Sequence, residues 1–234
     1  QVVFRGEQLF LGNLAVLHPT QLDSMYIQAQ CSQLYCTDQL LQDLLTQLHL
    51  HKVKLPPIIS NIEHLHYTGD IKGQLDDFHL HGAFRSPLGI LQVNGTMQLA
   101  PSLQYLDFQG HLSTKNFKLG QLVGHDKLGA ISLEAYMEGR VDSTQLTHAK
   151  AKGDITQLDY NGYTYHNIHL DGSWSINELS GHMSIQDKNV QLSINGLTEW
   201  DKQDIRMDLD VNLDHIQPAA LHLTEQYPDR KSVV

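Results

Sequence analysis

The sequence predicts a mostly-β protein built on one large antiparallel sheet. Three observations predict it: apolar and polar residues alternate with a period of two, the links between several alternating segments are very short, and few segments have helical periodicity. A period of two places apolar side chains on one face of a strand and polar side chains on the other. Short links permit antiparallel hairpins only, because a parallel crossover needs a dozen or more residues.

The clearest strand is 131–141, where apolar residues or glycine fill one face and mostly polar residues fill the other. The same alternation predicts strands at 149–155, 168–176, 179–185, 190–194 and 205–213. Asn177 and Glu178 form one link between them, and 187–189 form the next. From about residue 165 onward the sheet is therefore predicted to be a meander.

The first third of the chain is less regular, with short predicted strands at 9–11, 14–17 and 25–30. One helix is predicted at 37–48, because Thr37 and Asp38 can cap it and a stripe of leucines follows. It has no lysine or arginine, so we expect it to pack on the sheet rather than on a membrane. Pro56 and Pro57 then interrupt the chain.

Alternation resumes at 71–75, 78–84 and 91–93, and the segment 117–129 is predicted to form one loose helical turn. Asn94-Gly95 and Asn161-Gly162 are typical of turns that need a positive φ. About a dozen strands result, more than an open sheet normally carries without curling or splitting. Their apolar face must close as a barrel or sandwich, fold into a trough, or cover something that is not protein.

Composition limits the classes of function. The chain has 234 residues, 41% of them hydrophobic, and a formal net charge of -10, which makes nucleic acid an unfavourable partner. No run approaches the roughly 18 apolar residues of a membrane-spanning helix, so we expect no transmembrane segment in this chain. Because it begins at Gln1 without a signal-like stretch, we interpret it as an internal segment of a longer protein.

The cysteine and histidine residues are candidate binding groups. Cys31 and Cys36 could form a disulfide across a turn or bulge, or remain free thiols. The chain has 15 histidines, some of them in His-x-His pairs at 49 and 51, 64 and 66, and 79 and 81. A metal could bridge such a pair, but each pair alternates with apolar residues, which favours an ordinary position on the polar face. We therefore predict neither a metal nor a cofactor.

No pattern indicates catalysis. Ser173 and Ser175 lack the strand-to-helix turn that exposes a nucleophile, and alternation places Asp208 and Asp210 in solvent. No phosphate-binding or dinucleotide-binding glycine loop is present in the sequence. The aromatic residues at 160, 163, 165 and 174 could stack on a ligand, but packing within a hairpin is favoured. We therefore expect a protein that is not an enzyme.

Several spaced motifs carry a family resemblance. They are 55–73, which opens with Leu-Pro-Pro; 82–91, which reads Gly-Ala-Phe-Arg-Ser-Pro-Leu-Gly-Ile-Leu; 108–139, with its regularly spaced glycines; 160–172; and 181–189. Together they resemble TamB-like translocation and assembly proteins of the AsmA-like superfamily, in the form found in Bacteroidetes. The resemblance covers roughly 55–225, whereas 1–54 matches poorly and 226–234 is expected to be the ragged end of the segment.

The resemblance implies a fold and a cellular setting. It implies an elongated, curled antiparallel trough with an apolar concave face and one or two short helices. It also implies a periplasmic protein of a Gram-negative cell envelope, anchored in the inner membrane outside this chain. Family members are associated with lipid transport between the two membranes and with outer-membrane protein assembly through an Omp85-type partner.

Two functions remain open at this point. The first is a conduit that carries phospholipid or another acyl-chain lipid in the apolar groove. The second is an interaction module that helps outer-membrane protein assembly by accepting a β-strand at a sheet edge. The residues expected to line the groove are Ile131, Leu133, Met137, Val141, Ile168, Leu170, Trp174, Leu179, Met183, Ile185, Leu192, Ile194, Met207, Leu209 and Val211.

Overall fold

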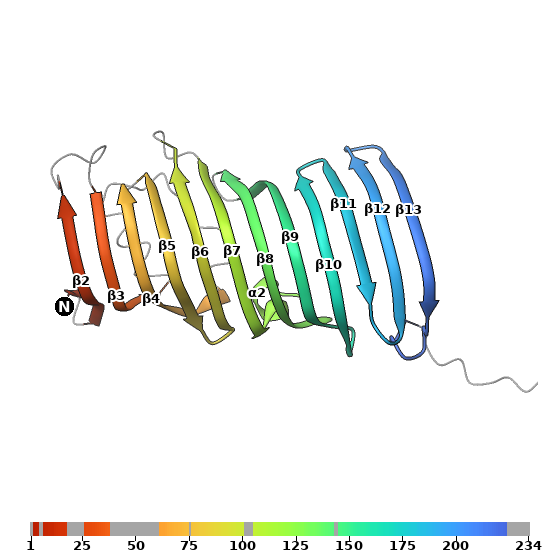
Figure 1. Ribbon diagram of the computed structural model, residues 1–234, viewed down its shortest axis with the longest axis horizontal. Coiled ribbons are helices and arrows are strands. Elements are labelled where there is room, and N and C mark those ends of the chain that lie inside the picture. The colour runs from red at the N-terminus through yellow and green to blue at the C-terminus, as the bar shows by residue number, and fades with distance from the viewer. Residues whose placement is uncertain are drawn as a thin grey trace, which may run out of the picture.

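The protein is described from a computed structural model, which places residues 2–4, 7–17, 26–37, 61–74, 76–100, 105–142 and 145–223. These residues form a 13-stranded sheet in which every strand pairs with its neighbours in the chain. The strands follow one another along the long axis of the molecule (Figure 1). The strands are β1 Val2–Phe4, β2 Glu7–Leu17, β3 Tyr26–Thr37, β4 His64–Gln74, β5 Asp77–Ser86, β6 Gly89–Leu99, β7 Tyr105–Phe117, β8 Leu128–Asp142, β9 Gln145–Tyr160, β10 Tyr163–Ser175, β11 Glu178–Gln186, β12 Val190–Trp200 and β13 Ile205–Ile216.

All pairings in this sheet are antiparallel, so the predicted mostly-β antiparallel fold is confirmed. The strand order begins at β1 and ends at β13, which leaves the sheet unclosed with these two strands as its edges. A closed barrel is therefore wrong for the described residues, and the curled, trough-like sheet is the architecture observed.

Of the two Asn-Gly pairs predicted to form turns, one forms a hairpin turn and the other does not. Asn161 and Gly162 have φ values of 51° and 77° and link β9 to β10, as predicted. Asn94-Gly95 does not form a turn; it lies within β6, and Gly95 pairs with Gly110 of β7. An Asn-Gly pair is a local preference only, and here the glycine is used where two neighbouring backbones approach closely.

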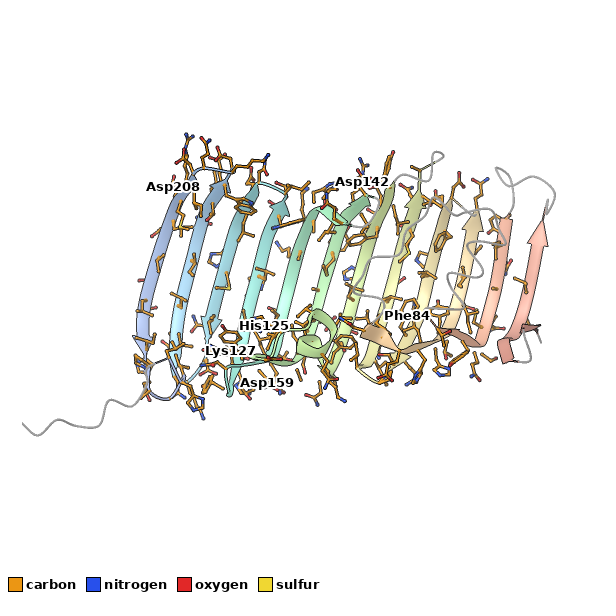
Figure 2. The ribbon with its side chains drawn as sticks, turned by 180° about the vertical axis from the view of Figure 1, so that it is seen from behind. Phe84, His125, Lys127, Asp142, Asp159 and Asp208 are labelled. Atoms are coloured by element: carbon orange, nitrogen blue, oxygen red, sulfur yellow. The ribbon has the colours of Figure 1, made fainter. Side chains whose placement is uncertain are left out.

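The predicted helical turn at 117–129 is observed as α2, Leu119–Val123, which packs against β8. Gly120 is buried there, and a Cβ at this position would lie 1.6 Å from the Leu128 carbonyl oxygen. Asn61 donates a hydrogen bond from Nδ2 to the Leu122 carbonyl oxygen at 2.7 Å. Seen from behind, α2 and the loop with His125 and Lys127 lie in front of the sheet (Figure 2).

The predicted helix at 37–48 falls outside the described residues, except that Thr37 is the last residue of β3. The predicted division between 1–54 and 55–225 and the tail at 226–234 also fall outside them. The strands on either side of that division, β3 and β4, are hydrogen-bonded neighbours. The described strands of both segments therefore belong to one sheet.

Tertiary contacts in this sheet are local along the chain. Apart from α2 against β8, the extensive contacts between described elements all join strands that are consecutive in sequence. Such an architecture behaves as a one-dimensional array, in which each strand depends mainly on its two neighbours. We therefore expect the effect of a substitution on stability to be concentrated in the strands around it.

Candidate functional site

One face of the sheet is apolar from β2 to β13, and we call it the apolar face. The register aligns its side chains in rows that cross the strands. One row consists of Leu14, Ala29, Ile71, Leu80, Gly95, Gly110, Met137, Ala151, Gly172, Gly181, Gly196 and Leu209. A neighbouring row consists of Leu34, Tyr67, Phe84, Leu91, Thr114, Leu133, Ile155, Ile168, Ile185, Leu192 and Leu213. The surface is therefore continuous along the sheet.

All of the predicted groove residues lie on the apolar face, but their exposure differs. Ile131, Ile168 and Ile185 are buried and belong to the packed interior. The half-buried ones are Leu133, Met137, Val141, Leu170, Trp174, Met183, Leu192 and Ile194. The exposed ones are Leu179, Met207, Leu209 and Val211. Side chains that a ligand can contact thus gather toward the β10–β13 end.

A glycine-floored hollow of about 360 Å³ lies in this exposed part of the apolar face. Glycines 172, 181 and 196 pair directly across β10, β11 and β12, and Ala149 and Ala151 of β9 continue the lining. Larger side chains also line it: Leu170, Trp174, Leu179, Met183, Ile194 and Leu209. Its volume falls in the range of about 300 to 1,000 Å³ that is usual for small-molecule sites.

Tyr67 of β4 lies along its own strand on the apolar face. The Tyr67 hydroxyl donates a hydrogen bond to the Asp70 carbonyl oxygen at 2.8 Å, three residues further along the same strand. The tyrosine side chain lies over the glycines of β4 and β5, because a Cβ at Gly69 or Gly82 would come within 2.9 or 3.0 Å of its hydroxyl oxygen. The Tyr67 ring also packs against Phe84, with ring centroids 4.9 Å apart. The two rings therefore cover the paired glycines of β4 and β5 at this end of the apolar face.

Tyr67 is expected to ionise at unusually high pH. Its burial, the nearby Cys31 thiol and the Asp70 carboxylate together raise its pKa to about 12. Because the unfolded chain releases this proton near pH 10, stability should fall by up to about 1.4 kcal/mol per pH unit between pH 10 and 12. Tyrosinate absorbance of the wild type minus that of Tyr67→Phe measures this titration. A midpoint near 10 would contradict the buried geometry.

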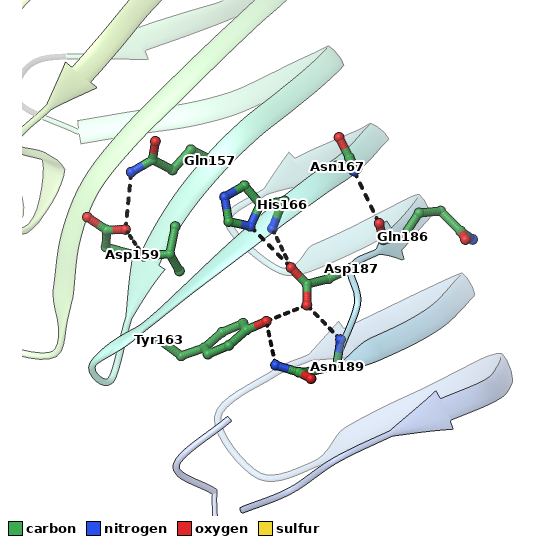
Figure 3. A network of polar contacts seen from close by, with 9 residues as sticks. Gln157, Asp159, Tyr163, His166, Asn167, Gln186, Asp187 and Asn189 are labelled. Atoms are coloured by element: carbon green, nitrogen blue, oxygen red, sulfur yellow. Dashed lines mark hydrogen bonds and ion pairs between the residues drawn. The ribbon is translucent and has the colours of Figure 1, made fainter. Parts of the chain in front are cut away.

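A buried aspartate at the β11–β12 turn was not predicted as a structural centre. The Asp187 side chain is 1% exposed and lies among donors from two elements (Figure 3). It accepts hydrogen bonds from the Tyr163 hydroxyl, from the Asn189 N–H at 2.9 Å and from the His166 N–H at 3.1 Å. Burial raises its pKa, but these hydrogen bonds outweigh burial and hold the pKa below its usual range. The turn is thereby fastened to the start of β10.

Next to this network, Leu221 closes one margin of the apolar face. Leu221 is 1% exposed and packs in one cluster with Ile168, Ile185 and Val190. The Gln217 N–H donates to the Asn189 carbonyl oxygen at 2.8 Å, which joins the end of β13 to the same turn. This margin is therefore a packed edge of the groove, whereas Leu179 and Met207 toward the opposite strand ends are exposed.

The opposite face carries polar and charged side chains in cross-strand pairs. Lys152 Nζ lies 2.6 Å from Asp171 Oδ2, and Lys150 Nζ lies 3.0 Å from Glu138 Oε1. Arg140 contacts both carboxylate oxygens of Asp107, at 2.6 and 2.8 Å, and its hydrogen bonds hold the pKa of that carboxyl below its usual range. These pairs keep the outer face solvated while the inner face stays apolar.

Some of the histidine and cysteine residues singled out in the sequence lie within the described residues. Within the part of the chain that the structure describes, no three His, Cys, Asp or Glu side chains come together as a metal site. His79 and His81 of β5 alternate with the apolar-face residues Phe78 and Leu80, and His49 and His51 lie outside the described residues. Cys31 is a free, buried thiol, so the candidate disulfide is not formed. Burial and the Asp70 carboxylate raise its pKa.

No protein-family model, curated protein or solved structure matches the chain. None of the helices in the described ranges is long and apolar enough to cross a membrane.

Proposed function

We propose that this chain is a segment of a lipid conduit, which holds acyl chains on its apolar face and lets them pass along the sheet. The observation that carries the proposal is the continuity of that face from β2 to β13, with an exposed, glycine-floored hollow at one end. A core-forming face would be covered by a second layer, whereas Leu179, Met207 and Val211 are 52%, 65% and 52% exposed.

The energetics of lipid transfer fit such a surface. Exposing one acyl chain of about 16 carbons to water costs on the order of 12 kcal/mol, at about 0.8 kcal/mol per methylene. A continuous apolar surface removes most of that barrier. The 13 strands, about 4.8 Å apart, span about 55 to 60 Å. The segment could therefore carry a chain across a large part of an aqueous gap.

The family resemblance suggests where this happens. In the proposed setting, the longer protein is anchored in the inner membrane, spans the periplasm and works with an Omp85-type outer-membrane partner. The transported ligand would be a phospholipid or another acyl-chain lipid. What supports this setting is the set of spaced motifs between residues 55 and 225, together with a sheet that has one apolar and one solvated face.

A charge on the apolar face should weaken lipid binding. Leu179→Asp puts a carboxylate beside the hollow, and an acyl chain can cover it only by removing its water. We expect the affinity for a fluorescent long-chain fatty acid to fall roughly tenfold or more. Titration of the purified chain with this probe, combined with native mass spectrometry for co-purified lipid, measures the effect.

The matched control is Leu223→Asp, because Leu223 is 53% exposed, like Leu179 at 52%, but does not line the hollow. The control should bind the probe as the wild type does. Equal losses in both variants, or no binding by the wild type, would contradict the conduit. An interaction module for unfolded outer-membrane proteins would instead bind extended peptides and tolerate Leu179→Asp.

A further inference from the structure

A second, smaller hollow lies on the apolar face over β6 and β7, and we call it the small hollow. Its volume is about 60 Å³, and its floor is formed by Gly95 and Gly110, which pair directly. Large apolar side chains flank these glycines along both strands: Val93, Met97, Phe108 and Leu112. The glycine-floored hollow over β10–β12 has the same construction, with paired glycines between two walls of large side chains.

Met137 of β8 separates the two hollows. Both lie on one row across the sheet, in which each residue pairs with the next: Gly95, Gly110, Met137, Ala151, Gly172, Gly181 and Gly196. Met137 lines the small hollow, and Ala151 on its other side lines the glycine-floored hollow. Leu209 of β13 follows Gly196 and closes the row at the far end. The methionine side chain is therefore the barrier between the two hollows.

The residues around Met137 leave its side chain room to move. On β8 it stands between Ala135 and Gly139, so a large residue lies between two small ones, the reverse of the order in the hollows. The Phe108 ring covers Gly139, because a Cβ there would lie 2.8 Å from the Phe108 Cζ. Ala135 carries only a methyl group and pairs with Gly153. The unbranched methionine side chain, with three rotatable bonds, can therefore turn toward Ala135.

The shape of the row suits an acyl chain rather than a peptide strand. In the glycine-floored hollow the two walls stand four residues apart on each strand, as Leu170 and Trp174 do, so their Cα atoms are about 13 Å apart. Side chains from both walls narrow this width. A peptide strand in such an apolar slot would leave backbone N–H and C=O groups without partners, whereas an acyl chain has no such groups.

We propose that Met137 is a gate between the two hollows and limits the length of the acyl chain that the glycine-floored hollow accepts. The inference rests on the proposed conduit. The acyl chain lies along the row, across the strands. It ends at Ala151 while the Met137 side chain stands in the row. When that side chain turns toward Ala135, the acyl chain continues over Gly110 and Gly95.

Displacement of a fluorescent fatty acid by decanoic acid and by octadecanoic acid tests the gate. The wild type should bind both acids. Met137→Ala removes the barrier, so octadecanoic acid should bind about tenfold more tightly, which corresponds to covering two further methylene groups. The floor from Ala151 to Gly196 spans three strand spacings, about 14 Å, and the decanoic chain is short enough to stay within it. Its affinity should therefore change less than about twofold.

Ala135→Leu tests the movement of the gate, because it fills the space into which Met137 turns. It should weaken binding of octadecanoic acid about threefold and leave decanoic acid unchanged. Leucine at this position extends the wall formed by Leu112 and does not enter the row, so Met137→Ala/Ala135→Leu should keep the gain of Met137→Ala.

The control is Leu223→Ala, which removes an exposed apolar side chain outside both hollows and should leave both affinities unchanged. Circular dichroism confirms that each variant is folded. A wild type that binds neither acid contradicts the conduit itself, and the gate with it. If the wild type binds both acids but Met137→Ala shifts them equally, or shifts neither, the gate is overturned and the conduit stands.

Discussion

Replacing Asp187 with alanine is expected to lower the free energy of unfolding of the β10–β12 region by about 3 kcal/mol. The substitution leaves the Tyr163 hydroxyl and the backbone N–H groups of His166 and Asn189 without their acceptor. These donors surround a side chain that is 1% exposed, so water cannot replace the carboxylate without opening the turn.

Hydrogen exchange measured strand by strand is the appropriate readout, because extensive contacts in the described sheet join consecutive strands. Protection should fall in β10, β11 and β12 and stay unchanged in β5–β7. The control is Asp201→Ala in the β12–β13 turn. Asp201 also accepts backbone hydrogen bonds, from Gln203 at 2.7 Å and Asp204 at 2.8 Å, but it is exposed. Asp201→Ala should lower the free energy of unfolding by less than about 1 kcal/mol. An equal loss in the Asp187 and Asp201 variants would contradict the role of burial.

The same carboxylate sets an acid limit on stability. Because the Asp187 pKa is lower in the folded chain than in the unfolded chain, its contribution is complete above the unfolded value of about 3.9. The contribution is lost as the pH falls through the folded pKa. The difference in protection between wild type and Asp187→Ala should therefore be constant at neutral pH and shrink below about pH 4.

The periodic part of the fold was predictable because alternation reports directly on the two faces of a strand. Segments such as 131–141 and 205–213 each fall within one observed strand, β8 and β13. Hairpin links such as 187–189 fixed the antiparallel order, since no crossover fits them. The strand ends were less predictable; β9 runs Gln145–Tyr160, well beyond the predicted 149–155, because polar residues at its ends interrupt the pattern.

The sequence predicts which residues share the apolar face, but it does not predict where that face is exposed, covered or hollow. Alternation identified Leu179 and Ile185 as members of the same surface, yet Leu179 is 52% exposed and Ile185 9%. Ile185 packs in a cluster with Ile168, Val190 and Leu221, and the position of Leu221 depends on how the chain returns after β13. The alignment of Gly172, Gly181 and Gly196 depends on the register that the short links 176–177 and 187–189 set between the strands, and not on the alternation within any one strand.

The Asp187 network shows a second limit of sequence reasoning. The alternation indicates 187–189 only as a short link, although an aspartate two residues before an asparagine is typical of a turn whose side chain accepts a backbone N–H. The partners on β10, Tyr163 and His166, are distant in sequence and become neighbours only through the meander. A turn signal could therefore suggest the local bond but not the burial.

Gly181→Ala is expected to have an effect of similar size, about 3 kcal/mol, on the strands that form the hollow. Gly181 has a φ of 140°, and a Cβ there would lie 2.4 Å from both the Asp171 carbonyl oxygen and the Gly172 Cα. These contacts are with backbone atoms, so no side-chain rotation relieves them, and β10 and β11 must separate. Hydrogen exchange should show reduced protection in these two strands.

Gly124→Ala separates backbone strain from steric overlap. Gly124 follows α2 with a φ of 68°, and a Cβ there would meet nothing within 4 Å. This control should lower the free energy of unfolding by about 1 kcal/mol, because the alanine is strained only by the left-handed backbone conformation. The additional loss of stability in Gly181→Ala, compared with Gly124→Ala, then measures the steric effect of the close approach of β10 and β11. Equal costs for the two substitutions would show that the paired glycines are not needed for close strand packing, and the hollow would need another explanation.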